Sequence, residues 1–234
     1  MPWQRSFQLK EFNDFWRISP ISFRDGSYGA MELKKELLEQ GSKKTQTEWL
    51  AYSIDAVRHN GFYVGSAPLH YSLTDLLCEN KNHLQYTKII EEIRNFLEER
   101  LKLQLNTLSI PFYHPMPSPD EISHFQGFPK SYLTREHLFG TEEYLPQLWD
   151  ADRMCLALLG EEDSARVNAV NQWLCNKDTY LSRVRTKIPS KGLGKIQLGI
   201  DANSFRIEVG TSSTITQLPA LGMRIRRLRK RGNA

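Results

Sequence analysis

The chain has 234 residues, of which 40% are hydrophobic, 25% charged and 11% aromatic. This composition is typical of a globular protein and excludes the collagen-like, intrinsically disordered and disulfide-stabilised classes. No apolar run is long enough to span a bilayer, and the N-terminus lacks the apolar segment of a secretory signal, so we expect a cytoplasmic protein. The three widely spaced cysteines indicate free, buried thiols in a reducing compartment.

The positive charge is concentrated at the C-terminal end. From Lys177 to Ala234 the chain has thirteen Lys and Arg against three acids, a net charge of +10, so the preceding residues carry −6 of the total of +4. Such asymmetry indicates a polyanionic partner for the basic part, which can be nucleic acid, an anionic surface or an acidic protein.

Residues 1–110 are expected to form an aromatic arm followed by a helical region. Seven aromatic residues among the first thirty predict an arm that packs on the core through its rings. Thr45-Gln46-Thr47-Glu48 has the pattern of a helix capping box, and Ile93 and Leu97 fall on the apolar stripe of the longest predicted helix. Short connections predict antiparallel helices in one layer. The predicted helices cover residues 28–40, 45–60, 66–80 and 83–102.

Residues 111–148 form a proline-rich region, with five of the eleven prolines between Pro111 and Pro129, and we expect a long loop there. Residues 149–222 are expected to contain helices and a β-hairpin, packed as one globular unit with the first part. Asp163 and Ser164 are expected to cap one of these helices. In this part helical spacing gives way to a period of two after Asn176, and turn-forming residues 201–204 separate the two hairpin strands. Residues 223–234 are expected to be a basic tail.

These elements predict an α+β fold, in which a helical N-terminal layer is followed by a small antiparallel β-sheet near the C-terminus. Several short phrases resemble those of uncharacterised prokaryotic hypothetical proteins, among them Asn60-Gly61-Phe62-Tyr63-Val64-Gly65-Ser66 and Pro219-Ala220-Leu221-Gly222-Met223-Arg224. The resemblance implies a prokaryotic or viral origin and carries no activity.

Motifs with a known chemistry are absent from the sequence, including the P-loop and the dinucleotide-binding, zinc-protease and serine-hydrolase patterns. The basic turn from Lys191 to Lys195 leads into a strand, which is the wrong context for a phosphate-binding loop. His114, His124 and His137 can converge near the proline-rich loop, but surface roles are the favoured interpretation, and we predict no metal and no cofactor. Whether the chain is an enzyme stays open.

The leading hypothesis is a binding protein that engages nucleic acid non-specifically through its basic C-terminal region. Alternation from Tyr180 to Ile188 predicts a solvent face with three basic residues and a core face with Val184 and Ile188. The predicted nucleic-acid-binding residues are Arg183, Arg185, Lys187, Lys191, Lys195, Arg224, Arg226, Arg227, Arg229, Lys230 and Arg231.

Four other interpretations stay open. A metal-dependent nuclease or other hydrolase acting on nucleic acid can use Asp201 and Glu208, with Lys195 and Arg206 nearby. A structural or assembly protein can use a basic tail that contacts a packaged genome or an acidic partner. The basic segment can also form an amphipathic helix on an anionic membrane or a partner, since Leu221, Ile225 and Leu228 fall on one side of a helix. It can also serve only solubility.

Overall fold

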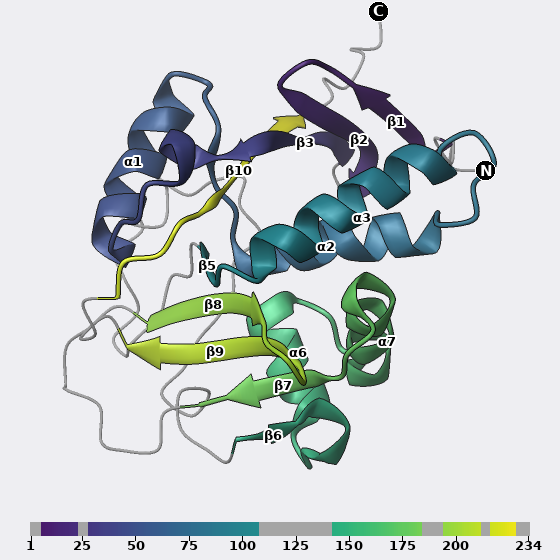
Figure 1. Ribbon diagram of the computed structural model, residues 1–234, viewed down its shortest axis with the longest axis vertical. Helices are drawn as coiled ribbons and strands as arrows, with labels where there is room; N and C mark the ends of the chain where they lie inside the picture. The colour runs from purple at the N-terminus through teal and green to yellow at the C-terminus, as the bar shows by residue number, and fades with distance from the viewer. Residues whose placement is uncertain (1–5, 23–27, 108–141, 184–193, 212–215, 228–234) are drawn as a thin grey trace, which may run out of the picture.

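The computed structural model describes residues 6–22, 28–107, 142–183, 194–211 and 216–227 (Figure 1). The described strands form two five-stranded sheets. The first sheet has the order β1-β2-β3-β10-β4 and every pairing in it is antiparallel. Its strands are β1 (Gln8–Glu11), β2 (Phe15–Ser22), β3 (Tyr28–Leu37), β10 (Leu221–Arg227) and β4 (Tyr63–Val64).

The second sheet has the order β5-β8-β9-β7-β6, and β7 and β9 form its parallel pair. Its strands are β5 (Leu105–Thr107), β8 (Gly194–Ile200), β9 (Phe205–Thr211), β7 (Thr179–Ser182) and β6 (Glu143–Tyr144). The described α-helices are α1 (Gln46–Arg58), α2 (Ala67–Glu79), α3 (Thr87–Leu101), α6 (Ala151–Leu159) and α7 (Ser164–Cys175). Two short 3₁₀ helices, η1 (Leu38–Gly41) and η2 (Leu145–Gln147), lie between these elements.

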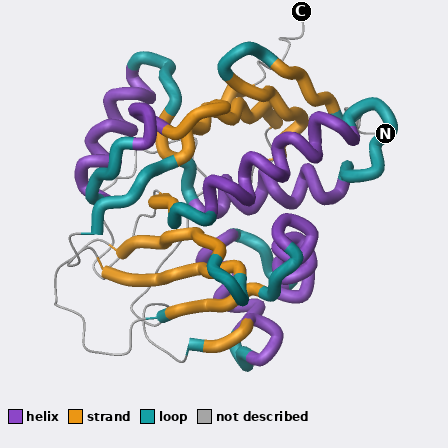
Figure 2. Tube along the Cα trace, in the orientation of Figure 1, coloured by secondary structure: helices purple, strands orange, loops and turns teal. Residues whose placement is uncertain are grey.

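Helices α2 and α3 lie between the two sheets (Figure 2). Residues such as Met31 and Leu33 of the first sheet, Ile93 of α3 and Leu198 of the second sheet therefore belong to one continuous hydrophobic core. Helix α1 packs at the β4 end of the first sheet, where Trp49 closes a smaller apolar cluster. Each sheet thus turns one face toward the helices.

The expected helical N-terminal layer is wrong, because strands begin at Gln8 and residues 28–37 form β3 rather than a helix. Met31 and Leu33 follow a period of two, but Glu32 between them is buried as well. A central strand buried on both faces lacks the clean polar alternation of a half-buried strand. The spacing of Leu33, Leu37 and Leu38 also fits a helix, so the local pattern predicts the wrong element here. The fold as a whole is α+β.

Several local predictions are confirmed. The capping box is present, since the Glu48 amide donates to Thr45 Oγ1 at 3.3 Å and the Thr45 amide donates to Glu48 Oε2 at 2.8 Å. Helix α3 buries Ile93 and Leu97 as expected. Asp163 caps α7 by accepting a hydrogen bond from the Arg166 amide, and β8 and β9 form the predicted antiparallel hairpin.

The prediction of a basic tail is wrong for residues 223–227, which belong to β10 between β3 and β4. The same finding excludes the amphipathic helix there. Residues 218–220 position this strand: Trp49 Nε1 donates to the Leu218 carbonyl at 2.7 Å, and the Leu38 amide donates to the Ala220 carbonyl at 3.0 Å. Residues 228–234 lie outside the described residues. So do residues 111–141 of the expected proline-rich loop, whereas residues 143–147 form β6 and η2.

Candidate anion-binding face

Three neighbouring strands of the first sheet bring charged side chains to its outer face. Arg17 of β2 lies directly opposite Glu32 of β3, and Arg224 of β10 lies opposite Glu32 from the other side. Strand alternation sends their neighbours, such as Trp16 and Met31, to the core. The arginine face is defined here by Arg17, Glu32, Arg224 and Arg226 together with Phe12, Phe15 and Phe62.

The arginine side chains converge on the carboxylate of Glu32. Arg17 Nε donates to Oε1 at 2.9 Å, while Arg224 Nε and Arg226 Nε lie 2.5 Å and 3.4 Å from Oε2. Arg224 Nη1 donates to the Asn60 carbonyl at 2.8 Å, and Arg226 Nη1 donates to Asn60 Oδ1 at 3.1 Å. The side chain of Glu32 is 0% exposed, whereas those of Arg17 and Arg226 are 37% and 39% exposed.

The arginine face carries more positive than negative charge. Burial alone would raise the pKa of Glu32, but hydrogen bonds from Arg17 and Arg224 and their charges hold that pKa below its ordinary value. Glu32 is therefore a carboxylate at neutral pH. With three guanidinium groups around one carboxylate, the cluster carries a net charge of +2. Two of those guanidinium side chains reach solvent.

Phenylalanine rings pack against two of these guanidinium groups, those of Arg17 and Arg224. Phe12 and Phe15 stack at 4.5 Å between ring centroids, and the guanidinium carbon of Arg17 lies 4.8 Å from the centroid of Phe12. The guanidinium carbon of Arg224 lies 4.4 Å from the centroid of Phe62 and 5.7 Å from that of Phe15. Stacking on an aromatic ring fixes the plane of a guanidinium group while its N–H edges stay able to donate.

The structure places the predicted nucleic-acid-binding residues in several different parts of the fold. Arg224 and Arg226 lie on the arginine face, and Arg227 is the last residue of β10. Lys195 lies in β8. The predicted residues outside the described part of the chain are Arg185, Lys187, Lys191, Arg229, Lys230 and Arg231.

The prediction that Arg183 lies on a solvent face is wrong. Arg183 is 5% exposed, follows Leu181 on the buried side of β7, and its Nη1 lies 3.1 Å from Asp150 Oδ2. The alternation was correct, but the buried side was assigned to the wrong set of residues. An arginine enters a core when a carboxylate meets it there, and Asp150 is far away in sequence. The expected core residues Val184 and Ile188 lie outside the described residues.

Sequence reasoning missed Arg17, Glu32 and the three phenylalanines as site residues. A signal was present: Phe15 and Arg17 alternate with Trp16 and Ile18, which is the pattern of a strand with one core face. The contribution of Glu32 had no local signal, since its partner Arg224 is 192 residues away in the chain.

The nuclease hypothesis gains no support from the hairpin carboxylates. Asp201 Oδ1 accepts hydrogen bonds from the Asn203 and Ser204 amides at 2.8 Å, which is a turn-stabilising role. Glu208 Oε1 lies 3.3 Å from Arg206 Nε. Within the described ranges, no three His, Cys, Asp or Glu side chains are grouped so that they could hold a metal ion. The histidines considered for metal binding, His114, His124 and His137, fall outside those ranges.

The prediction of buried free thiols is confirmed for Cys155 and Cys175, whereas Cys78 is half-buried. Burial raises the pKa of the Cys155 thiol to about 12 and that of Cys175 to about 11. A nucleophilic cysteine needs a lowered pKa, so neither thiol is suited to attack a substrate at neutral pH.

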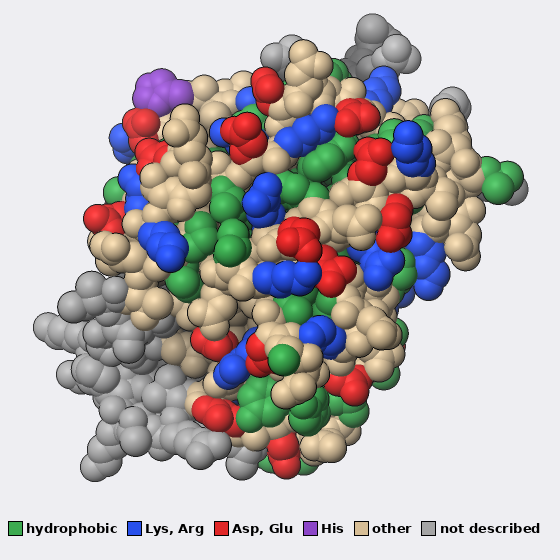
Figure 3. All heavy atoms as spheres, viewed as in Figure 1, with side chains coloured by type: hydrophobic (Ala, Val, Ile, Leu, Met, Phe, Trp, Pro, Cys, Tyr) green, Lys and Arg blue, Asp and Glu red, His purple; other side chains and the backbone are tan. Residues whose placement is uncertain are grey.

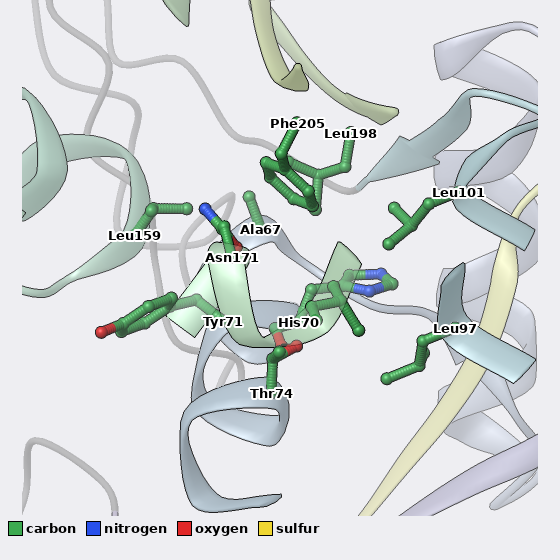
Figure 4. Close-up of a pocket in the computed structure, with 11 residues that line it drawn as sticks. Ala67, His70, Tyr71, Thr74, Leu97, Leu101, Leu159, Asn171, Leu198 and Phe205 are labelled. Carbon is green, nitrogen blue, oxygen red and sulfur yellow. Dashed lines mark hydrogen bonds between the residues drawn. The ribbon is translucent and has the colours of Figure 1, made fainter. Parts of the chain in front are cut away.

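An interior pocket lies between α2, α3, α7 and the second sheet (Figure 4). Most of its lining is leucine, phenylalanine and alanine, and two of its polar groups already bond within the chain. Thr74 Oγ1 donates to the His70 carbonyl, and Asn171 Nδ2 donates to Thr179 Oγ1. His70 Nε2 has no hydrogen-bond partner, and burial lowers the pKa of His70 to about 4. The pocket is therefore part of the core packing around a neutral histidine.

The surface on the side of Figure 3 shows Lys and Arg intermingled with Asp and Glu over the described residues, without a large patch of one sign. None of the helices in the described ranges is long and apolar enough to cross a membrane. No family model, curated protein or solved structure matches the chain. The interpretation of the arginine face therefore depends on the residues that form it.

Proposed function

We propose that the chain binds nucleic acid through the arginine face of the first sheet. The observation that carries the proposal is the excess of guanidinium groups, three around the single carboxylate of Glu32. A guanidinium group has five N–H donors in a planar fork that suits phosphate oxygens. Glu32 occupies only part of this donor capacity, so the exposed edges of Arg17 and Arg226 can donate to phosphate.

Glu32 also holds the guanidinium groups in place. A free arginine side chain loses rotamer freedom when it binds a ligand, which costs about 0.5–1.5 kcal/mol for each immobilised side chain. Here the ion pairs to Glu32 and the contacts with phenylalanine rings already restrict Arg17 and Arg224. The face is therefore preorganised for an anion.

The basic sequence continues beyond the last described strand of this face. β10 ends at Arg227, which pairs with Gly29 of β3, and Arg229, Lys230 and Arg231 follow directly in sequence. Nucleic acid bound to the arginine face would therefore lie within a few residues of further basic side chains. This continuity favours a polymer of phosphates over a single small anion.

The test measures how affinity depends on salt. Fluorescence anisotropy with labelled single-stranded and duplex DNA of random sequence would compare the wild type with the double variant Arg17→Ala/Arg226→Ala. We expect weaker binding by the variant and a log–log salt slope that is flatter by about 0.7–0.9 for each lost phosphate contact. Arg224 is left in place so that Glu32 keeps a partner.

The charge-matched control is Lys81→Ala/Lys88→Ala, which removes two exposed charges from the α2–α3 connection and α3 on the other side of the sheet. Equal affinities and equal slopes for both double variants would refute the proposal, as would an absence of binding to either form of DNA at low salt.

A further inference from the structure

We infer that the arginine face accepts single-stranded nucleic acid in preference to duplex, an inference that rests on the proposed function. The carrying observation is the interleaving of aromatic rings with the guanidinium groups. Phe12, Phe15 and Phe62 come from the β1–β2 turn, from β2 and from the residue before β4. All three rings are partly exposed.

The rings form a row across the face. The centroid of Phe15 lies 4.5 Å from that of Phe12 and 5.8 Å from that of Phe62. Arg17 lies over the Phe12 end of the row, and Arg224 lies between Phe15 and Phe62. Aromatic rings and guanidinium groups thus lie next to one another along one side of the sheet. Unstacked bases bind such surfaces by stacking on aromatic rings and on guanidinium planes.

Charge alone does not separate the two forms of nucleic acid, since both carry phosphates. The net charge of +2 around Glu32 gives an electrostatic contribution that salt weakens. Duplex DNA keeps its bases inside the helix and offers this face only phosphates. A single strand offers phosphates to the guanidinium groups and bases to the rings, so it gains a contribution that salt does not screen.

The strand order also suits an extended ligand. The arginine face is built from three adjacent strands of one sheet, and its charged groups point to a shared carboxylate. An extended single strand that lies across these strands can reach the guanidinium groups and the rings together, whereas readers of the major groove usually insert a helix or a two-stranded ribbon.

The experiment compares the full chain with short oligothymidine and with the duplex of the same length, at a fixed moderate salt concentration. We expect the single strand to bind more tightly. Phe12→Leu and Phe62→Leu keep apolar bulk and remove the π-face, and each should weaken single-strand binding by about 5- to 150-fold, since stacking contributes 1–3 kcal/mol per base. Duplex binding should weaken less than single-strand binding, because the duplex uses only the guanidinium groups that the rings help to hold.

Phe96→Leu is the matched control, since Phe96 is a half-buried phenylalanine on α3 that also lies under an arginine, Arg100. Thermal unfolding of each variant checks that the fold is kept. Equal binding of single strand and duplex, or equal loss in the control, would overturn the inference and leave the proposed function intact. No binding to either probe would overturn both.

Discussion

His70 links the stability of the core to pH. Its ring is buried in α2, its Nε2 has no hydrogen-bond partner, and burial lowers its pKa from 6.5 to about 4. The folded state therefore holds His70 neutral at a pH where the unfolded chain protonates it. Since the unfolded state binds more protons, the free energy of unfolding falls as the pH drops below 6.5 and continues to fall to about 4.

The magnitude follows from the two pKa values. At about 1.36 kcal/mol for each pKa unit, the difference between 6.5 and about 4 amounts to about 3 kcal/mol of stability lost on acidification. This is a large part of the stability of an ordinary domain, about 5–15 kcal/mol. Urea denaturation at several pH values between these limits measures it.

His70→Leu and His70→Gln remove the titrating group in two ways. Both should reduce the loss of stability over this pH range by about 3 kcal/mol relative to the wild type. His70→Leu should cost little at neutral pH, because it also removes an unpartnered buried nitrogen. If both variants lose as much stability as the wild type on acidification, His70 is not held neutral by burial and the reasoning fails.

Three further changes test the packing and the ion pairs. Ile93→Ala should lower the free energy of unfolding by about 2–5 kcal/mol, whereas Glu98→Ala on the same helix should cost well under ~1 kcal/mol; equal effects in urea denaturation would show that the assigned face of α3 is wrong. Arg183→Ala should cost about 3–5 kcal/mol because it leaves Asp150 buried without its partner, and a melting temperature equal to that of the wild type would contradict this. Glu32→Gln should reduce the loss of stability that occurs as the pH falls below 4.5. A carboxyl group whose pKa is lower in the folded than in the unfolded chain stabilises the fold at pH values above its unfolded pKa, and this contribution is lost as the pH falls. If the free energy of unfolding falls with pH in the variant as steeply as in the wild type, the result would count against the ion-pair cluster.

Local signals predicted the helices better than the sheets. The capping residues Thr45 and Asp163 and the stripe through Ile93 act over a few residues, so their effect can be read from a short window. No short stretch of sequence identifies strand β3, because its position in the sheet buries Glu32 as well as the apolar neighbours. Burial on both faces is set by tertiary contacts that the local pattern does not contain.

The arginine face depends on contacts between residues that are far apart in the sequence. Arg224 and Arg226 belong to a segment whose charge suggested a tail, and only the pairing of β10 with β3 brings them to Glu32. Arg17 reaches the same carboxylate from β2. Predicting the cluster therefore required the order and register of three strands, which strand sequences alone specify weakly. The prediction that Arg224 and Arg226 bind nucleic acid stays a prediction, now with a defined geometry.

The arginine face contains more guanidinium groups than are needed to neutralise Glu32. One arginine would neutralise Glu32, and a buried ion pair is in general weak evidence of stabilisation, because apolar residues in its place often serve as well. The guanidinium groups repel one another, and this repulsion offsets part of their attraction to Glu32. A phosphate at the exposed edges of Arg17 and Arg226 would supply further negative charge. The excess positive charge is therefore only partly compensated in the free protein and would be better compensated in a complex with an anion, which is the difference that binding depends on.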